Sequence, residues 1–319
     1  MSHCDAGDKG LALRLARGML IPLLLFLPLS ASAWNAAGHR LGALIAWQQL
    51  DDATREKIGA ILAQHPDHER WIARARGNPP ELAAFLGAST WPDDIKADKR
   101  FYDAGQDAET PLLPGFPDMA RHRHWHYLDK PLGHPPKHED SDGELDRQLE
   151  RLSDTLRNSS SDNRQRVYAL PWLIHLVADA HQPLHTVSRY DAAGKSDRGG
   201  NRLLVTNPFH PRRASMSLHG YWDDLAGPPW LHGHYLEEAA ARITASHPQA
   251  PRRSATKRWI AESWQIARDS AYPPENDTAM PVLLDGDFHQ KAQEIAQRRI
   301  AESGYRLAAL LRNLLRSKP

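Results

Sequence analysis

The residues of this chain best suited to chemistry are histidines and aspartates at spacings that favour metal binding. His175 and Asp179 form a His-x-x-x-Asp pair, and His219 and Asp223 repeat it. Because residues four apart share one face of a helix, each pair can present an imidazole and a carboxylate to one place. We combine the two pairs with five further residues into one candidate metal site: Trp34, His39, Asp93, His126, His175, Asp179, His185, His219 and Asp223.

Any one such pair, taken alone, is more often an ordinary hydrogen-bonded neighbour pair. Two pairs, together with His122, His124 and His126 among 18 histidines, favour a metal site instead. Mixed His and Asp ligands without thiolate suit zinc in a hydrolytic site, although manganese and iron also fit this ligand type. Four other histidines stand in polar contexts and are expected to be solvent-exposed: His65, His68, His138 and His247.

Residues 1–33 have the pattern of a secretory signal peptide. Two arginines precede an apolar run from Met19 to Leu29, and Ala31-Ser32-Ala33 follows it. The run is shorter than the about 20 residues of a membrane-spanning helix. We therefore expect cleavage after Ala33, export to the periplasm or the medium, and no stable membrane anchor.

Cleavage at that point would give Trp34 an α-amine, which readily loses its proton to a metal. The amine nitrogen and the carbonyl oxygen of Trp34 can then chelate one ion, and His39 could complete the site. Considered alone, Trp34 would be interpreted as a buried N-terminal aromatic residue.

The remaining chain, residues 34–319, has 37 basic and 37 acidic residues and no Lys/Arg run. Its global charge therefore indicates no nucleic-acid or membrane surface, and any attraction for phosphate has to be local. Its only candidate cysteine, Cys4, leaves with the peptide, so no disulfide can form and bound metal could supply stability instead. We expect one domain and a monomer.

Hydrophobic periodicity predicts a mostly α-helical fold, as in Leu145, Leu149, Leu152 and Leu156, or from Ile295 to Leu314. Asp52 and Asp162 are possible N-caps. One extended piece, Arg202 to Thr206, is expected after a Gly199-Gly200-Asn201 turn. Pro183 should end the helix with His175 and let the chain swing His185 toward a neighbouring ion. Further helices are expected at 39–50, 53–64, 80–89, 164–181, 215–225, 233–246 and 255–270, and loops at 99–121, 130–143 and 186–200.

Six motifs together resemble the S1/P1 nucleases, a family of zinc-dependent single-strand nucleases related to bacterial zinc phospholipase C. They occur in family order between residues 34 and 224, and the rest of the chain matches only in being helical. The resemblance implies an all-α domain over residues 34–319. The motifs are Trp34-Asn-Ala-Ala-Gly-His39, Trp91-Pro-Asp93-Asp94-Ile-Lys96, Trp125-His126-Tyr127-Leu128-Asp129, His175-Leu-Val-Ala-Asp179-Ala-His-Gln-Pro-Leu-His185, Gly199-Gly200-Asn201 and Leu218-His219-Gly-Tyr-Trp222-Asp223.

Carried over position by position, the resemblance implies three zinc ions. The first would be held by Asp93, His126, His175 and Asp179, the second by Trp34, His39 and Asp179, and the third by His185, His219 and Asp223. Three ions outweigh three carboxylates in charge, so the site would attract a phosphodiester.

Such a site would activate water for in-line attack on phosphorus and release 5′-phosphate products from RNA and single-stranded DNA. The family precedent also includes 3′-mononucleotides. Asp93, Lys96 and Asp179 are the expected catalytic residues. Lys96 stands where the family often has Arg, and its point charge could still stabilise the phosphate.

Tyr127 and Asp129 could form a base pocket, with a ring that stacks and a carboxylate that accepts hydrogen bonds. They could equally well support His126. Asp224 departs from the Asn common in the fungal enzymes, and its negative charge argues against direct contact with phosphate.

The same residues also fit two functions other than a nuclease. A zinc phospholipase C would use a similar cluster, but phospholipases typically have Glu at the position of Asp223. A non-catalytic exported zinc-binding protein would usually display flexible His-rich tracts, whereas these ligands are spread over separate helices. A metal-free hydrolase is disfavoured because the sequence contains no Gly-x-Ser-x-Gly elbow and no Walker-type loop.

Overall fold

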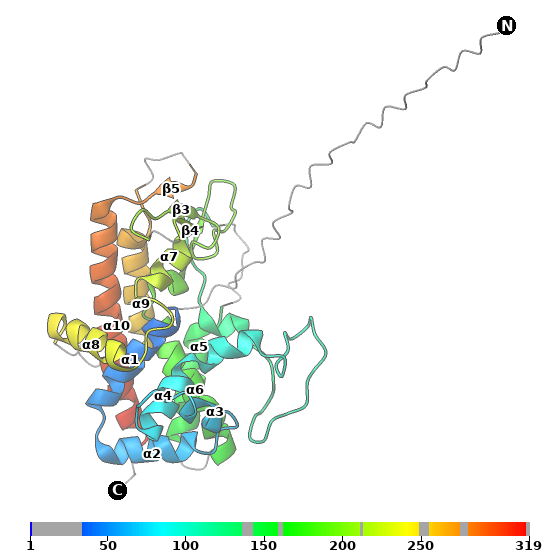
Figure 1. Ribbon diagram of the computed structural model, residues 1–319, viewed down its shortest axis with the longest axis vertical. Helices are drawn as coiled ribbons and strands as arrows, with labels where there is room; N and C mark the ends of the chain where they lie inside the picture. The colour runs from blue at the N-terminus through cyan, green and yellow to red at the C-terminus, as the bar shows by residue number, and fades with distance from the viewer. Residues whose placement is uncertain are drawn as a thin grey trace. The chain divides into compact units, whose positions relative to one another are not determined.

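The computed structural model describes Met1 and residues 34–135, 143–158, 162–210, 213–248, 255–274 and 280–316. This part of the chain is mostly helical, with short strands between the helices (Figure 1). The expected all-α class is confirmed. Apart from Met1, the predicted signal peptide lies outside the described residues. In the described part, no helix has the length and apolar character needed to cross a membrane.

Most of the predicted helices form close to their expected positions. The α-helices are α1 (Ala36–Gln49), α2 (Asp52–Leu62), α3 (His68–Ile72), α4 (Pro80–Asp94), α5 (Leu145–Arg157), α6 (Asn163–Asp179), α7 (Leu218–Asp224), α8 (Gly233–Ser246), α9 (Thr256–Ile266) and α10 (Gly286–Leu314). Short 3₁₀ turns are η1 (Ile95–Ala97), η2 (Arg123–His126) and η3 (Pro183–Thr186), and a π-helical turn, η4 (Ala267–Ala271), extends α9.

Helix α6 is the buried centre of the fold. Every residue from Val167 to Asp179 is buried, and the helix packs against α4 on one side and α5 on another. Trp172 is fully buried among aromatic rings that include Trp91 and Trp125. Because interiors pack densely and exclude water, a side chain projecting from α6 is held in a fixed position.

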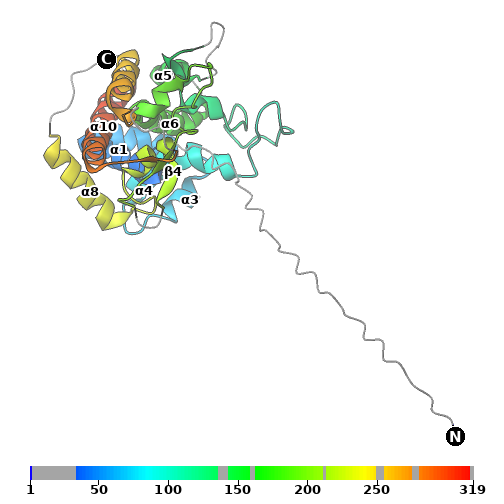
Figure 2. The ribbon, with the colours of Figure 1, turned by 90° about the horizontal axis from the view of Figure 1, so that it is seen from above.

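Helix α1 packs against both α4 and α10, and it lies beside α10 in two views at right angles (Figures 1 and 2). The close approach of α1 and α10 depends on glycine. A Cβ added at Gly304 would lie 2.6 Å from Cγ2 of Ile45 and 2.8 Å from the Gly42 carbonyl oxygen. At position 304, a side chain larger than hydrogen does not fit unless the neighbouring atoms of α1 shift.

Two small sheets complete the described structure. Strands β1 (Lys130–Gly133) and β2 (Val187–Tyr190) pair in parallel, with Lys130 opposite Val187 and Gly133 opposite Tyr190. Strand β3 (Leu204–Thr206) pairs antiparallel with β4 (Ser215–Ser217) and parallel with β5 (Val282–Leu283). Strand β3 matches the expected extended piece. Strands β1 and β2 fall in segments expected to be loops, because their pairing joins distant parts of the chain and leaves no local pattern.

Two local predictions are wrong. The N-cap of α2 is Asp51, whose carboxylate accepts from the Thr54 amide at 2.8 Å, and Asp52 lies in the first turn. His65 is buried rather than exposed, because its ring stacks on Trp71 and its Nδ1 accepts from the Asp67 amide. The N-cap assignment of Asp162 is confirmed.

Substitution of Gly304 by alanine should lower the free energy of unfolding by about 1–3 kcal/mol, because the added methyl overpacks the contact between α1 and α10. Urea denaturation measures this change. Gly286→Ala, in the same helix, is the matched control, since a Cβ there has no neighbour within 4 Å. Equal stability of the two variants would contradict the packing described for Gly304.

Candidate metal centre

The structure brings eight of the nine predicted ligand side chains into three neighbouring groups. They come from six separate elements of the fold, and the Asp93 side chain is the most exposed, at 14%. The groups that could hold an ion are His39, Asp93 and His175; His126, His175 and Asp179; and His185, His219 and Asp223. Motifs that are far apart in the sequence therefore lie close together in the fold.

The first two groups meet at the carboxylate of Asp179, which is fully buried at the end of α6. Its Oδ2 lies 3.1 Å from Nδ1 of His126 and 3.3 Å from Nε2 of His175. Its Oδ1 lies 3.5 Å from Nε2 of His39. The two oxygens thus face different imidazoles, which is the arrangement of a carboxylate that can bridge two ions.

Asp93 reaches the same place from the last turn of α4. Its Oδ1 lies 3.8 Å from Nε2 of His175, and its Oδ2 lies 3.8 Å from Nε2 of His39. The rings of His39 and His175 stack with centroids 3.8 Å apart. Four elements, α1, α4, α6 and η2, therefore converge on one small buried volume.

The third group follows α6 along the chain. The helix stops at Asp179, and Pro183 opens η3, which carries His185 toward α7. Nε2 of His185 lies 3.0 Å from Nε2 of His219, which in turn lies 3.7 Å from Oδ2 of Asp223. The end of α6 before Pro183 therefore places His185 beside His219, and binding of an ion there stays a prediction.

Backbone carbonyls fix the tautomers of three of these histidines. Nδ1 of His175 donates to the Ser89 carbonyl at 2.8 Å, Nδ1 of His185 to the His126 carbonyl at 2.7 Å, and Nδ1 of His219 to the Gly199 carbonyl at 2.7 Å. A carbonyl oxygen can only accept, so in the neutral rings the lone pair lies on Nε2. This second hydrogen bond is the usual support of a metal-bound histidine.

The tautomers make the donor set fit a cation. In neutral His185 and His219, two Nε2 lone pairs face each other at 3.0 Å, a contact that needs a positive charge between them. Burial lowers the pKa of His185 well below its usual value, which disfavours a shared proton. Both ring nitrogens of His39, Nε2 of His126 and Oδ1 of Asp179 are also buried without a hydrogen-bond partner in the described structure. Zinc, which accepts imidazole and carboxylate ligands, would satisfy Nε2 of His39 and Oδ1 of Asp179, which lie 3.5 Å apart.

Burial also sets the protonation of the metal-free site. It lowers the pKa of His39 and His126 well below 6.5, and it raises that of Asp179 to about 6 and that of Asp223 well above its usual value. Burial opposes protonation of His175, but the carboxylates of Asp179 and Asp93 raise the pKa of its ring overall. Without an ion, the carboxylates therefore tend to hold protons that an ion has to displace.

Trp34 is fully buried, two residues before the start of α1. Asn35 caps α1 by accepting from the amides of Ala37 and Gly38, and its own amide donates to the Asp223 carbonyl at 3.4 Å. The residue before α1 is thereby tied to the element that carries the third group.

Asp224 has a structural role that the sequence did not reveal. Its Oδ1 accepts from Nδ2 of Asn35 at 3.2 Å, and its Oδ2 pairs with Arg213 at 3.2 Å. Asp224 thus anchors the segment that positions Trp34. This role agrees with the expectation that Asp224 does not contact phosphate.

The other predicted site residues lie at the edge of the centre. Nζ of Lys96 donates to Oδ1 of Asp93 at 2.6 Å, and the Lys96 side chain is 9% exposed. Asp129 accepts from the Ser188 hydroxyl at 2.7 Å, and the Tyr127 hydroxyl lies 3.0 Å from Nδ1 of His124. Both Tyr127 and Asp129 are partly exposed, beside the start of the β1–β2 pair.

Sequence reasoning assigned no role to Gln182, although it stands within a quoted motif. Its amide nitrogen donates to Oδ1 of Asp223 at 2.9 Å, and its amide oxygen accepts from the Leu184 amide. The turn that contains Gln182 is fixed from outside, since Ser263 donates to the Ala180 carbonyl and Arg299 to the His181 carbonyl. Only the three-dimensional fold brings these residues from α9 and α10 to the turn.

The buried cluster of imidazoles and carboxylates has the ligand types of a metal-dependent hydrolase. The family model described as S1/P1 Nuclease matches residues 34–316. The chain belongs to the S1/P1 nuclease family. It is a nuclease, hence a hydrolase, and this family is zinc-dependent.

Named relatives agree with this assignment. Endonuclease 3 of Arabidopsis thaliana is 26% identical over 307 residues, which cover 90% of this chain and 91% of the relative. Endonuclease 4 of the same plant is 24% identical, over 71% of this chain and 84% of the relative. Nuclease S1 of Aspergillus oryzae is 23% identical, over 90% of this chain and 93% of its own length. The similarity therefore spans nearly the whole described structure.

The apparent zinc affinity should fall as the pH falls toward 5, and the loss due to Asp179 should begin below about 6. The raised pKa values of Asp179, His175 and Asp223 mean that zinc must displace protons there, whereas buried His39, His126 and His185 are already neutral. Each displaced proton costs about tenfold in affinity per pH unit below its pKa. Competition with a chromophoric chelator between pH 5 and 8 measures this, and constant affinity from pH 7 to pH 5 would refute it.

Proposed function

We propose that this chain binds three zinc ions and hydrolyses phosphodiester bonds of RNA and single-stranded DNA. Asp93, His126, His175 and Asp179 would hold the first ion. Trp34, His39 and Asp179 would hold the second, with Asp179 as the bridge, and His185, His219 and Asp223 would hold the third.

One observation carries the proposal most directly. Nε2 of His185 and Nε2 of His219 face each other at 3.0 Å while both Nδ1 atoms donate to carbonyls, and both oxygens of buried Asp179 face further imidazoles. A cation would stabilise these ring nitrogens and carboxylate oxygens, because their lone pairs lie close together inside the protein. The proposed ligand set contains no thiolate, which favours an open hydrolytic site over a closed structural one.

Zinc in such a site supplies Lewis-acid charge and lowers the pKa of bound water toward neutrality. The chain's own groups would orient the reaction. Lys96 donates to Oδ1 of Asp93, the oxygen that faces His126 and His175, and Oδ2 of Asp93 would accept a hydrogen from an attacking water. The Lys96 ammonium would balance negative charge on the phosphorus oxygens in the transition state. Gln182 holds Oδ1 of Asp223, which leaves Oδ2 to face His219.

Attack in line with the 3′-oxygen would break the P–O3′ bond and leave 5′-phosphate products. The same geometry would serve 3′-mononucleotides as smaller substrates. The ring of Tyr127 would stack on a base, and Asp129, oriented by Ser188, would accept from its edge. Both residues are partly exposed beside His126, as a base pocket requires.

Preference for single strands follows from burial of the ligands. All the ligand imidazoles are at most 4% exposed, so a scissile phosphate has to enter a recess while its base turns aside. The flexible backbone of a single strand permits this, whereas base pairing in a duplex holds the base in the stack.

The Trp34 amine becomes a ligand only if residues 1–33 are removed, so we also propose export and cleavage after Ala33. The anchoring of Asn35 by Asp223 and Asp224 supports this maturation step, because it fixes the chain directly after Trp34. All nine proposed ligands come from one chain, which supports a monomer.

The zinc-bound chain starting at Trp34 should cleave single-stranded DNA and RNA to 5′-phosphate ends, and a chelator should abolish the activity. Phosphatidylcholine should not be hydrolysed. Product ends are identified by end-group analysis of labelled strands. Lipid cleavage alone would make the chain a phospholipase C, and zinc binding without either activity would favour a non-catalytic zinc protein.

A variant of Lys96 tests whether its ammonium group contributes to catalysis in this assay. Lys96→Met should lower kcat by about 100-fold with zinc content unchanged, since it removes one charge that stabilises the transition state. Lys291→Met, at an exposed position of α10, should behave like the unsubstituted protein.

A chain with one alanine added before Trp34 should lose an ion and most of its activity. The addition converts the chelating amine into an amide, which has no available lone pair. Metal analysis and the nuclease assay measure both effects on the same sample. Full zinc content together with full activity would show that Trp34 is not a ligand.

A further inference from the structure

Three arginines and one tryptophan gather on the surface directly beyond the metal ligands. We call them the Arg–Trp surface and define it as Arg40, Arg74, Arg76 and Trp230. Arg40 follows the ligand His39 in α1, Arg74 and Arg76 lie in the turn between α3 and α4, and Trp230 lies between α7 and α8.

Contacts between the segments place these residues together. Nη1 of Arg40 donates to the Pro229 carbonyl at 2.9 Å, directly beside Trp230. A Cβ at Gly233 would lie 3.8 Å from the carbonyl oxygen of Arg76, so the turn of Arg76 touches the start of α8. Arg40 also lies within electrostatic range of both Arg74 and Arg76.

The charge of this surface is positive. Burial lowers the pKa of Arg40 to about 10, a change that Asp94 opposes and Arg76 and Arg74 reinforce, so Arg40 remains cationic at neutral pH. His232 beside it stays neutral, because burial, Arg40 and Arg76 lower its pKa to about 4. Of the three charged groups that act on Arg40, Asp94 is negative and Arg74 and Arg76 are positive, so the charge around Arg40 is net positive.

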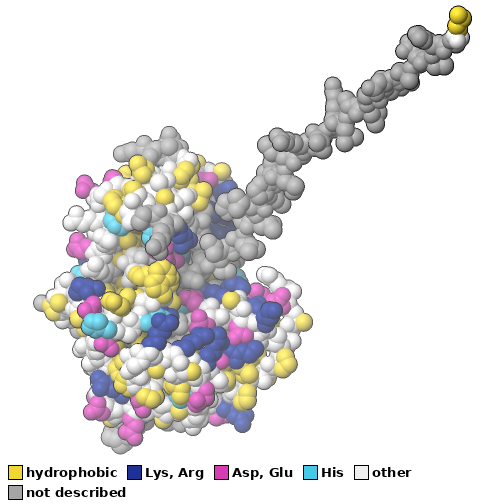
Figure 3. Space-filling model, in the orientation of Figure 1, with side chains coloured by type: hydrophobic (Ala, Val, Ile, Leu, Met, Phe, Trp, Pro, Cys, Tyr) yellow, Lys and Arg dark blue, Asp and Glu magenta, His cyan; other side chains and the backbone are white. Residues whose placement is uncertain are grey.

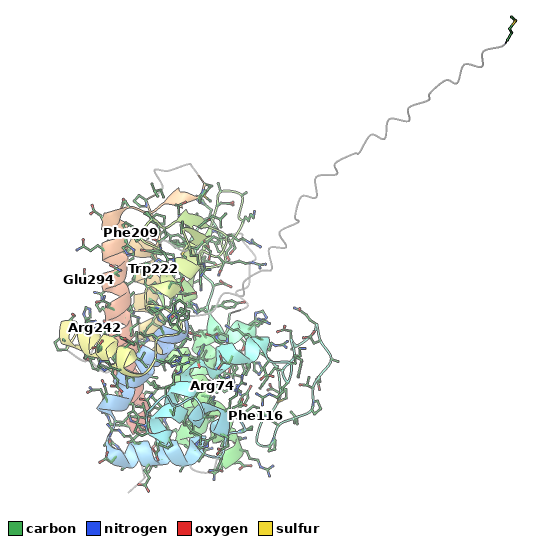
Figure 4. The ribbon with its side chains drawn as sticks, viewed as in Figure 1. Arg74, Phe116, Phe209, Trp222, Arg242 and Glu294 are labelled. Carbon is green, nitrogen blue, oxygen red and sulfur yellow. The ribbon has the colours of Figure 1, made fainter. Side chains whose placement is uncertain are left out.

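The side chains are presented to solvent. Trp230 is 68% exposed, which is unusual for the largest apolar side chain, and Arg74 and Arg76 are exposed as well. Arg76 also adopts a left-handed backbone with φ of 50°, a conformation that costs energy for a residue other than glycine. Figure 3 shows Lys and Arg side chains gathered beside hydrophobic ones on this face, and Figure 4 labels Arg74 in the same orientation.

An exposed indole with guanidinium groups nearby is the chemistry that binds single-stranded nucleic acid without sequence preference. Bases stack on the aromatic ring, and arginines follow the phosphates. The surface lies near the proposed site, because Arg40 is within electrostatic range of His39 and Asp94 is within that of Asp93.

We propose that the Arg–Trp surface binds nucleotides of a single strand beyond the scissile phosphate, with Trp230 stacking on a base and Arg74 and Arg76 on phosphates. This inference rests on the proposed function and deepens it. It implies that the chain prefers strands long enough to reach from the metal centre to Trp230.

The test compares a labelled single-stranded 20-mer with a dinucleotide, which is too short to cover both places. For Trp230→Ala, the ratio of kcat/KM for the 20-mer to that for the dinucleotide should fall about tenfold. For Arg74→Ala combined with Arg76→Ala, the slope of log affinity against log salt should become shallower by about 1.4. Fluorescence anisotropy of the 20-mer on the zinc-bound protein gives the affinity.

Matched controls change the same residue types elsewhere. Phe209→Ala removes another exposed ring, which stacks on His289, and Arg242→Ala removes an exposed arginine from α8 (Figure 4). Both controls should keep the ratio and the salt slope of the unsubstituted protein.

The outcomes separate this inference from the proposed function. Cleavage of the 20-mer with an unchanged ratio in Trp230→Ala and an unchanged slope in the arginine variant would overturn the inference and leave the nuclease proposal standing. Binding of the 20-mer that weakens in these variants, without cleavage of either substrate, would support the inference and overturn the proposed substrate.

Discussion

The buried carboxylate of Asp179 is the constraint on which the rest of the structure depends. An isolated carboxylate inside a protein is strongly unfavourable unless charge or hydrogen bonds compensate it. Here the compensation comes from imidazoles of α1, η2 and α6 itself, and Oδ1 still has no hydrogen-bond partner. Burial makes the Asp179 carboxylate unfavourable when no ion is bound. The same burial would make Asp179 a strong ligand for an ion. The packing of α1, α4 and η2 around α6 therefore serves the site as much as the core.

The turn after Asp179 extends this arrangement to the third group of ligands. Three residues separate the end of α6 from η3, and Ser263 and Arg299 hold the turn from α9 and α10. The β1–β2 pair then keeps the segment after His126 beside the segment after His185. Helices α9 and α10 thus support the fold. Their hydrogen bonds also reach the backbone between Asp179 and His185.

The sequence predicted the helices and the ligand residues better than the supports around them. Periodicity located α5, α6 and α8 closely, and His-x-x-x-Asp spacing predicted that the residues of each His–Asp pair lie close together, because helix geometry converts spacing directly into proximity. Strands β1 and β2, the burial of His65 and the anchoring of Asn35 by Asp224 depend on contacts between distant segments, which spacing does not encode. The role of Gln182 could have been suspected from its place in the motif, but its partner Asp223 is known only from the fold.

Zinc counted per chain by mass spectrometry tests the central claim, that Asp179 bridges two ions, most directly. After dialysis, the chain starting at Trp34 should hold three zinc ions, and Asp179→Asn should hold one, because both ions of the bridged pair lose a charged ligand. His219→Ala should hold two, which serves as the matched single-site loss. Circular dichroism of each variant establishes that the helices persist. Retention of two zinc ions by folded Asp179→Asn protein would contradict the bridge and, with it, the arrangement proposed for the whole centre.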